Sequence, residues 1–344
     1  MEQQHDTGTI ELATVKDREE LLDLLYRVFT HNNPTHPRFE KMYPDLFVPT
    51  EEALGCHAIM RVDGRIKACV GVYPMTVRTA GYEMTVAEVG QVGTDLDARG
   101  KGYMGRLMRF QLQRLKDAGI HIASLGGRHD RYGHFGFETA GSSFLYYLDA
   151  HSLHDVPVTR TIARHSDNPG EAVTDSMFEL YRKTSPAYVV ESADRFRARL
   201  SRAECEVWTA TPAGATEPDA WAVVSRTWKK IDAYCGSTDG LLEIALAACK
   251  ALDRLGIDIP SASRELGNAF RAHCTWLGLG MLEMIILNRE SLEKNFRDQG
   301  WKGPVLGNGP FKRGEEERYC FGPERAPGGG GLPYPFTLPY IYHA

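Results

Sequence analysis

A glycine-rich turn lies where the sequence predicts that a strand ends and a helix begins. The run from Asp97 to Gly105 reads Asp-Ala-Arg-Gly-Lys-Gly-Tyr-Met-Gly. Such a turn leaves backbone N–H groups unpaired at the positive end of the helix dipole, an arrangement that binds phosphate. Arg99 and Lys101 add positive charge, and the glycines let the backbone approach an anion closely. The turn therefore predicts a pyrophosphate site, although a plain connection or a nucleotide site shares the local pattern.

Two motifs flanking the predicted helix resemble those of the GNAT acyltransferase superfamily. Residues 99–104, Arg-Gly-Lys-Gly-Tyr-Met, match the first and fourth positions of its pyrophosphate signature, Gln/Arg-x-x-Gly-x-Gly/Ala. Residues 132–137, Tyr-Gly-His-Phe-Gly-Phe, match its Tyr-x-x-x-Gly-Phe/Tyr ending. Met104 departs from the signature, which has Gly or Ala there, and Gly105 follows it. The resemblance implies acetyl-CoA as co-substrate and an α/β fold with a mixed, mostly antiparallel central sheet flanked by helices.

The resemblance also assigns the residues that bind acetyl-CoA. The strand that precedes the turn, residues 92–94, would bind the pantetheine arm and the thioester oxygen through its backbone, since this strand separates from its neighbour in the superfamily. An ordinary paired strand is the alternative. The predicted ligands are Val92, Gly93, Thr94, Arg99, Gly100, Lys101, Gly102, Tyr103, Met104 and Gly105.

A general acid is expected at Tyr132. Attack by a primary amine on a thioester needs a neutral amine, a stabilised oxyanion and a protonated leaving thiolate. Tyr132 matches the acid of the family, and a phenol has a suitable acid strength for protonating a thiolate. Because Phe135 and Phe137 follow closely, core packing of Tyr132 is the alternative.

The general base has more than one candidate. Glu88 lies eleven residues before Arg99, the spacing of the strand glutamate that acts as base in histone-type GNAT enzymes, but a solvated strand face is the alternative. His134 lies within the second motif and could accept the proton, or be an outward-facing loop residue. In one group of relatives the carboxylate of the chain end reaches the active site, which makes the Ala344 carboxylate a third candidate.

That group is the bacterial acetyltransferases of the enhanced-intracellular-survival type, in which a degenerate second GNAT domain follows the first. The second half of this chain has a similar rhythm of elements without a glycine-rich cradle. The relatives continue into a sterol-carrier-like domain, whereas only residues 291–344 remain here. We therefore expect a shortened relative. Because such relatives assemble, a homo-oligomer is left open.

Alternating elements must position these residues. Apolar residues recur at helical spacing after Asp17, and Asp63-Gly64 is a typical hairpin turn. The predicted order is a strand at Ile10–Val15, a helix from Asp17, strands at His57–Val62, Ile66–Val77 and Met84–Thr94, a helix at Tyr103–Ala118 and a strand at Ile120–Leu125.

The second half repeats this rhythm after a polar connection near residue 155. It has predicted strands at Glu206–Ala210, Ala220–Ser225 and Ile231–Cys235, a helix at Gly240–Leu255 that Gly256 ends, and an apolar segment at Trp276–Asn288. We divide the chain into a GNAT domain at 1–155, a degenerate GNAT-like domain at 156–298, and a Gly/Pro-rich tail at 299–344. The aromatic end of that tail is expected to dock near the active site.

Composition narrows the function classes. The formal net charge is −5, and the Lys and Arg residues are scattered along the sequence, so no positively charged surface for binding nucleic acid is expected. The cysteines lack a Cys-x-x-Cys pair, and no signal peptide or membrane span is apparent, so a cytoplasmic protein is expected. His31, His36 and His57 lack metal-ligand spacing, and no metal is expected.

These features predict an N-acetyltransferase that moves an acetyl group from acetyl-CoA to a primary amine. The acceptor would be a small molecule or a lysine-type amine. Two alternatives remain, namely a non-catalytic acyl-CoA-binding module and a transferase for a longer acyl group.

Overall fold

The computed structural model describes residues 8–31, 33–79, 81–165, 169–202, 204–261 and 263–302, with backbone only at 140–142 and 281–282. The tail and Ala344 lie outside the described residues, so their predicted docking stays a prediction.

The N-terminal half contains the predicted elements with small shifts of their ends. Its α1 buries Leu21, Leu22, Leu24 and Leu25, as the helical spacing of these residues indicates. The elements are β1 (Thr9–Leu12), α1 (Arg18–Thr30), α2 (Phe39–Met42), α3 (Glu51–Leu54), β2 (His57–Val62), β3 (Arg65–Thr79), β4 (Tyr82–Thr94), α4 (Tyr103–Asp117), β5 (Ile122–Leu125), α5 (His129–Tyr132) and β6 (Glu138–Asp149), with short 3-10 turns at Val15–Asp17, Leu96–Ala98 and Gly133–Phe135.

The second half adds helices to the predicted strands. Its elements are β7 (Arg160–His165), α6 (Glu171–Thr184), β8 (Ala187–Val189), α7 (Ala193–Leu200), β9 (Cys205–Pro212), β10 (Ala220–Ser225), β11 (Lys230–Gly236), α8 (Thr238–Leu252), β12 (Arg254–Pro260), α9 (Arg264–His273), β13 (Trp276–Ile286) and α10 (Arg289–Asp298). The expected end of α8 at Gly256 is wrong. Asp253 takes the left-handed conformation that ends the helix, at φ +75°, and Gly256 lies inside β12.

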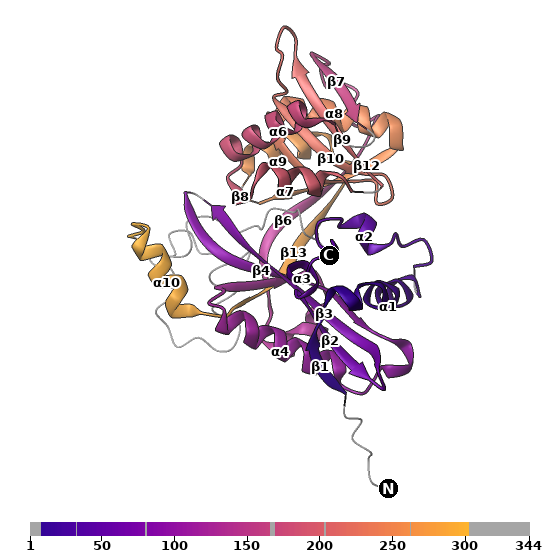
Figure 1. Cartoon of the computed structure of the whole chain (residues 1–344). Helices are drawn as coiled ribbons and strands as arrows, with labels where there is room; N and C mark the ends of the chain where they lie inside the picture. The colour runs from indigo at the N-terminus through magenta and orange to yellow at the C-terminus, as the bar shows by residue number, and fades with distance from the viewer. Residues whose placement is uncertain are drawn as a thin grey trace.

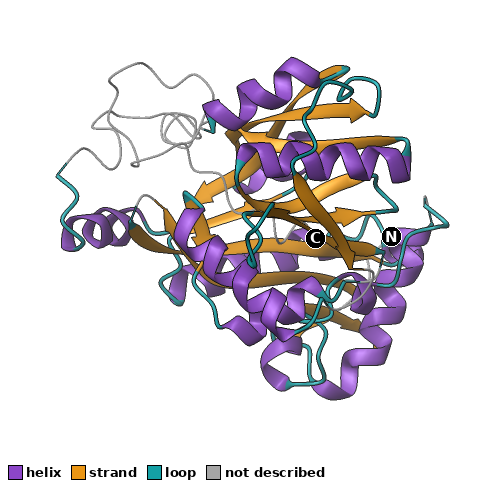
Figure 2. Cartoon of the chain, turned by 90° about the horizontal axis from the view of Figure 1, so that it is seen from above, coloured by secondary structure: helices purple, strands orange, loops and turns teal. Residues whose placement is uncertain are grey.

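The strands form one continuous sheet across both halves, in the order β1-β2-β3-β4-β5-β13-β6-β12-β11-β10-β9-β7, with β8 added to β3. All pairs are antiparallel except β4 with β5 and β11 with β12. Helices cover the sheet on both sides (Figure 2). The expected mixed, mostly antiparallel fold is confirmed.

β6 and β13 connect the two halves, and both run through the middle of the molecule (Figure 1). β13, from the second half of the sequence, lies between β5 and β6 and so completes the N-terminal part of the sheet. β6, from the first half, pairs with β12. The proposed division near residue 155 therefore separates sequence segments whose strands alternate within one sheet.

The two halves repeat one arrangement. In the first, β2, β3 and β4 form an antiparallel meander, α4 follows, and β5 returns parallel to β4. In the second, β9, β10 and β11 form the meander, α8 follows, and β12 returns parallel to β11. In the first half the helix starts at the turn that the sequence singles out.

Candidate active site

The N-terminus of α4 is open. Gly100 and Gly102 have φ values of +78° and +76°, which favour glycine, and a Cβ at either position would meet nothing within 4 Å. The N-cap residue, Gly102, provides no side-chain cap, and the first turn of α4 contains no acidic residue. The helix start therefore lacks a side-chain cap, the arrangement that suits an external anion.

β4 and β5 separate just before this turn. Their parallel pairing joins residues 86–88 to residues 122–124 and ends at Glu88 and Ser124. From Val89 to Thr94, β4 pairs with β3 on one edge, and no described strand covers the other edge. This is the separation that the resemblance predicts for residues 92–94.

A pocket of about 510 Å³ lies at this separation. It brings together four predicted ligands with two residues of α1 and one of α5. Its lining comprises Val92, Thr94, Arg99, Met104, Val28, Phe29 and Arg131. Arg99 and Arg131 place two guanidinium groups at the pocket, and Val28, Phe29 and Met104 supply apolar contact.

No sequence pattern marks Arg131, which directly precedes the second motif. None assigns Val28 or Phe29 to a binding site either. No local pattern shows that α1 ends beside the pocket, because that position depends on how α1 packs on β3 and β4.

Other predicted ligands lie around the pocket rather than on its wall. Gly93 is buried, with Cys69, Leu25 and Val28 as the nearest neighbours of a Cβ at that position. Tyr103 is a core residue. The Lys101 ammonium is 6.0 Å from the centroid of the Tyr103 ring. A Cβ at Gly105 would make ordinary contacts with Arg109 and Phe135. Met104 lies in the first turn of α4, so it does not prevent the turn from forming.

Tyr132 lies at the end of α5 and is 6% exposed. Its ring contacts Phe137 edge to face, with centroids 6.4 Å apart. Burial raises the pKa of the phenol, while the neighbouring Arg131 acts in the opposite direction. The hydroxyl is therefore protonated at neutral pH, as a general acid requires.

Glu88 is buried, at 3% exposed, and does not lie on a solvated face. The Ser124 hydroxyl donates to Oε2 over 2.7 Å, and Oε1 has no hydrogen-bond partner within the described part of the chain. Burial raises the pKa of Glu88 to about 8, although the bond from Ser124 lowers it. The histidine candidate, His134, is an exposed residue whose ring lies 3.9 Å from that of Phe135, centroid to centroid.

The second half approaches the Glu88 face of the sheet. Arg202 Nε donates to the Met42 carbonyl over 2.8 Å, and its guanidinium lies 5.1 Å from the centroid of the Tyr43 ring. The charge of Glu88 in turn contributes to raising the pKa of Tyr43. Arg202 of the second half therefore contacts Met42 and Tyr43, which lie on the same side of the sheet as Glu88.

The described residues contain no group of His, Cys, Asp and Glu side chains arranged to hold a metal ion. No described helix is long and apolar enough to span a membrane.

Comparison with known proteins agrees with this geometry. Residues 9–140 match the family model described as "Acetyltransferase (GNAT) domain". No curated protein matches the chain at significant similarity.

Solved structures share the fold over most of the chain. A probable N-acyltransferase from Enterococcus faecalis V583 has a TM-score of 0.65 at 14% identity, over 88% of this chain and 77% of that one. Eis1 from Mycobacterium abscessus has a TM-score of 0.55 at 15% identity, over 83% of this chain and 75% of that one. N-myristoyltransferase from Saccharomyces cerevisiae, solved with myristoyl-CoA, has a TM-score of 0.52 at 10% identity, over 81% of this chain and 79% of that one. Residues 9–140 are thus similar to the GNAT acetyltransferase domain family, and the chain shares its fold with these solved structures.

Proposed function

We propose that this protein is an N-acetyltransferase that moves the acetyl group of acetyl-CoA to a primary amine by direct attack. The observation that carries the proposal is the pocket between the separated β4 and β5, which opens at the uncapped N-terminus of α4. An acyl-CoA needs both an anion site for its pyrophosphate and a channel for its pantetheine arm, and this place supplies both.

The residues present fit the co-substrate. The N–H groups at the start of α4 and the Arg99 and Arg131 side chains would hold the phosphates, because charge-assisted hydrogen bonds to phosphate are strong. The open edge of β4 at residues 92–94 would hydrogen-bond the pantetheine arm and the thioester oxygen. Val28 and Met104 would contact the apolar part of the arm.

The reaction forms a C–N bond and breaks the C–S bond of the thioester. The amine nitrogen attacks the carbonyl carbon, and the nitrogen loses one proton to a base. Tyr132 donates the phenolic proton to the leaving thiolate. The products are an amide and the free thiol of coenzyme A.

Glu88 and the carboxylate of Ala344 are the two candidate bases. With a pKa of about 8, Glu88 is matched to accepting a proton near neutral pH once it is ionised. Adding a few residues after Ala344 tests the other candidate, because turnover that is unchanged by the extension removes the Ala344 carboxylate from the mechanism.

The second half would shape the acceptor cleft, and the tail at 299–344 would dock beside it, as in relatives of the enhanced-intracellular-survival type. Contacts of Arg202 with Met42 and Tyr43 support this part of the proposal, since they bring the second half to the Glu88 face.

Thiol release from acetyl-CoA with a panel of primary amines tests the proposed function. Turnover in the wild type, reduced strongly in Tyr132→Phe, is expected. Binding of acetyl-CoA without turnover with any amine would instead indicate an acyl-CoA-binding module. Competition between acetyl-CoA and thioesters of increasing chain length decides the acyl group, and a preference for a longer chain would contradict the acetyl assignment.

A further inference from the structure

β4 contains a strained residue directly before the segment that borders the pocket. Gln91 is the extra residue of a bulge, opposite the register shift between Cys69 and Gly71, and its φ is +45°. A residue other than glycine in the left-handed region costs about 1–3 kcal/mol and persists only where its surroundings hold it. Val92 follows immediately and lines the pocket.

Two buried side chains from neighbouring strands hold the Gln91 side chain. The Tyr73 hydroxyl lies between the Gln91 carboxamide, at hydrogen-bonding distance, and His57 Nε2, at 2.8 Å. His57, Tyr73 and Gln91 are 0%, 3% and 1% exposed. Gly71 provides the space for this cluster, because a Cβ there would lie 2.5 Å from the Tyr73 hydroxyl oxygen.

A count of protons gives each hydrogen bond a direction. His57 Nδ1 lies 3.2 Å from the Leu54 carbonyl, which can only accept, so Nδ1 is the donor. Burial lowers the pKa of His57 to about 4, and Nε2 of the neutral ring is then an acceptor. The structure places Gln91 Oε1 toward the phenol oxygen. If Tyr73 donates its one proton to His57 Nε2, the phenol oxygen can accept from the Gln91 amide only with the carboxamide turned over, so that its nitrogen faces Tyr73.

The second half has the same kind of bulge without this support. In β11 the extra residue is Asp232, opposite the register shift between Val223 and Val224. No residue from 230 to 235 has a positive φ. The strained form therefore occurs in the half that contains the pocket of Arg99 and Arg131.

We propose that His57, Tyr73 and Gln91 are positioning residues that hold the β4 bulge, and thereby orient the backbone at residues 92–94 toward the thioester. This inference rests on the proposed function. The triad touches neither substrate. Its effect is to set where the β4 edge points, so it acts on the chemical step more than on the binding of the nucleotide part of acetyl-CoA.

Tyr73→Phe tests the triad, because it removes the bridging hydroxyl and keeps the ring. We expect kcat to fall about tenfold, since small misplacements of reacting groups are costly, while the Kd for CoA changes less than twofold. Tyr181→Phe is the matched control. Tyr181 is another buried tyrosine whose hydroxyl has a backbone partner, the Val189 N–H at 3.1 Å, and we expect its kcat to stay within twofold.

The double variant Tyr73→Phe/Gln91→Gly separates positioning from general stability. Glycine adopts φ +45° without strain and needs no side-chain support, so kcat is expected to recover severalfold over Tyr73→Phe. Unchanged kcat in Tyr73→Phe, or a double variant no better than the single, would overturn the triad. If Tyr73→Phe does not fold, the double variant alone tests the triad. A kcat of the double variant near that of wild type supports the triad. A loss of kcat equal to that of the single variant Gln91→Gly overturns it. A wild type that binds acetyl-CoA but releases no thiol overturns the proposed function, and with it this inference.

Discussion

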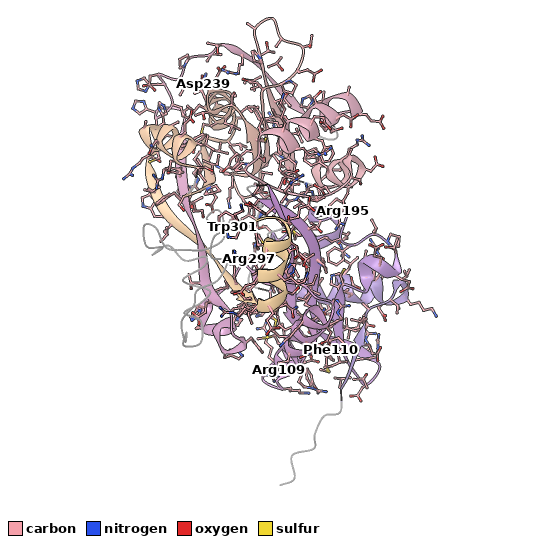
Figure 3. All side chains as sticks on the ribbon, turned by 90° about the vertical axis from the view of Figure 1, so that its left-hand side faces the viewer. Arg109, Phe110, Arg195, Asp239, Arg297 and Trp301 are labelled. Atoms are coloured by element: carbon pink, nitrogen blue, oxygen red, sulfur yellow. The ribbon has the colours of Figure 1, made fainter. Side chains whose placement is uncertain are left out.

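The start of α4 and the start of α8 occupy equivalent places in the two halves, yet only one is open to an anion. Each helix follows the last strand of a meander, and the strand after the helix pairs parallel to that last strand. Asp239, in the first turn of α8, and Arg109, on α4, lie at opposite ends of the molecule (Figure 3). The two helix starts can therefore be compared as separate environments.

α8 is closed by its own side chains. Ser237 caps it by accepting a hydrogen bond from the Gly240 N–H, and donates to Asp219 over 2.7 Å. Arg160 pairs with Asp219 at 2.9 Å. Although burial by itself raises the pKa of Asp219, the bonds from Arg160 and Ser237 hold it below the usual value. A carboxylate thus occupies the place where α4 has exposed glycines.

This difference shows that the shared topology alone does not produce an uncapped, glycine-rich helix start. A second pocket of about 480 Å³ does lie at the start of α8, lined by Arg264 and Cys235 among others. Glu265 also lines this pocket, so an incoming phosphate there would meet a carboxylate. The two halves therefore differ in the local residues at the helix start rather than in strand order.

The largest effect is expected from the general acid. Tyr132→Phe should lower kcat by about 10²–10³-fold and leave the Kd for acetyl-CoA nearly unchanged, since proton transfer contributes that much and the phenol does not line the pocket. Tyr234, which lines the second pocket, is the matched control. Tyr234→Phe loses one hydrogen bond to the Asp258 carbonyl, and should keep kcat within twofold. Equal losses in both variants would contradict the assignment.

The two halves should respond to pH with opposite sign. Glu88 has a folded-state pKa near 8, above its unfolded value of 4.5, so its contribution to stability falls as the pH rises between these values. Glu88→Gln should therefore gain stability over wild type with rising pH, by roughly 2–4 kcal/mol at pH 8.5. Urea unfolding at pH 5, 7 and 8.5 measures this. A constant difference would refute the raised pKa.

Glu243 provides the opposite case. Burial raises the pKa of Glu243, but hydrogen bonds from Arg160 and Thr159 outweigh this effect and hold the pKa below its usual value of 4.5. Its stabilisation is present above pH 4.5 and is lost as the pH falls through the folded-state pKa. Glu243→Gln should be less stable than wild type at pH 7, with a difference that shrinks in acid, and the same unfolding series detects it.

Reversing the charge of one arginine at each pocket tests the difference between the two helix starts. Arg99→Asp places a carboxylate before α4, as Asp219 stands before α8, and should weaken acetyl-CoA binding about 100-fold through the lost bond and the added repulsion. Arg264→Asp makes the same change at the second pocket and should alter the Kd less than twofold. Isothermal titration measures both, and comparable losses would show that the pockets are not distinct.

The smallest effect is expected at the cap of α8. Ser237→Ala should cost about 1 kcal/mol of stability, the usual contribution of an N-cap, and leave thiol release unchanged. A thermal or urea unfolding curve gives the first value. Lost turnover in a folded Ser237→Ala variant would link the second half to the chemistry.

The glycine-rich turn before α4 could be predicted from the sequence because its residues are local. Gly100, Gly102 and Arg99 stand together, and β2 and β10 have the predicted bounds, since turns and alternation mark them. Nothing local shows that β13 lies between β5 and β6, because an apolar strand fits either sheet half. No sequence pattern marks Gln91 either, since its bulge and its contact with Tyr73 depend on how β3 pairs with β4. Arg131 needed the position of α5 on the pocket.

Hydrogen–deuterium exchange with and without coenzyme A tests the central claim most directly, because it shows which helix start binds the anion. Slower exchange is predicted for the amides of residues 92–106, at the end of β4 and the start of α4, with no change at residues 236–242. Protection at 236–242, or none at 92–106 with coenzyme A well above its Kd, would contradict the account.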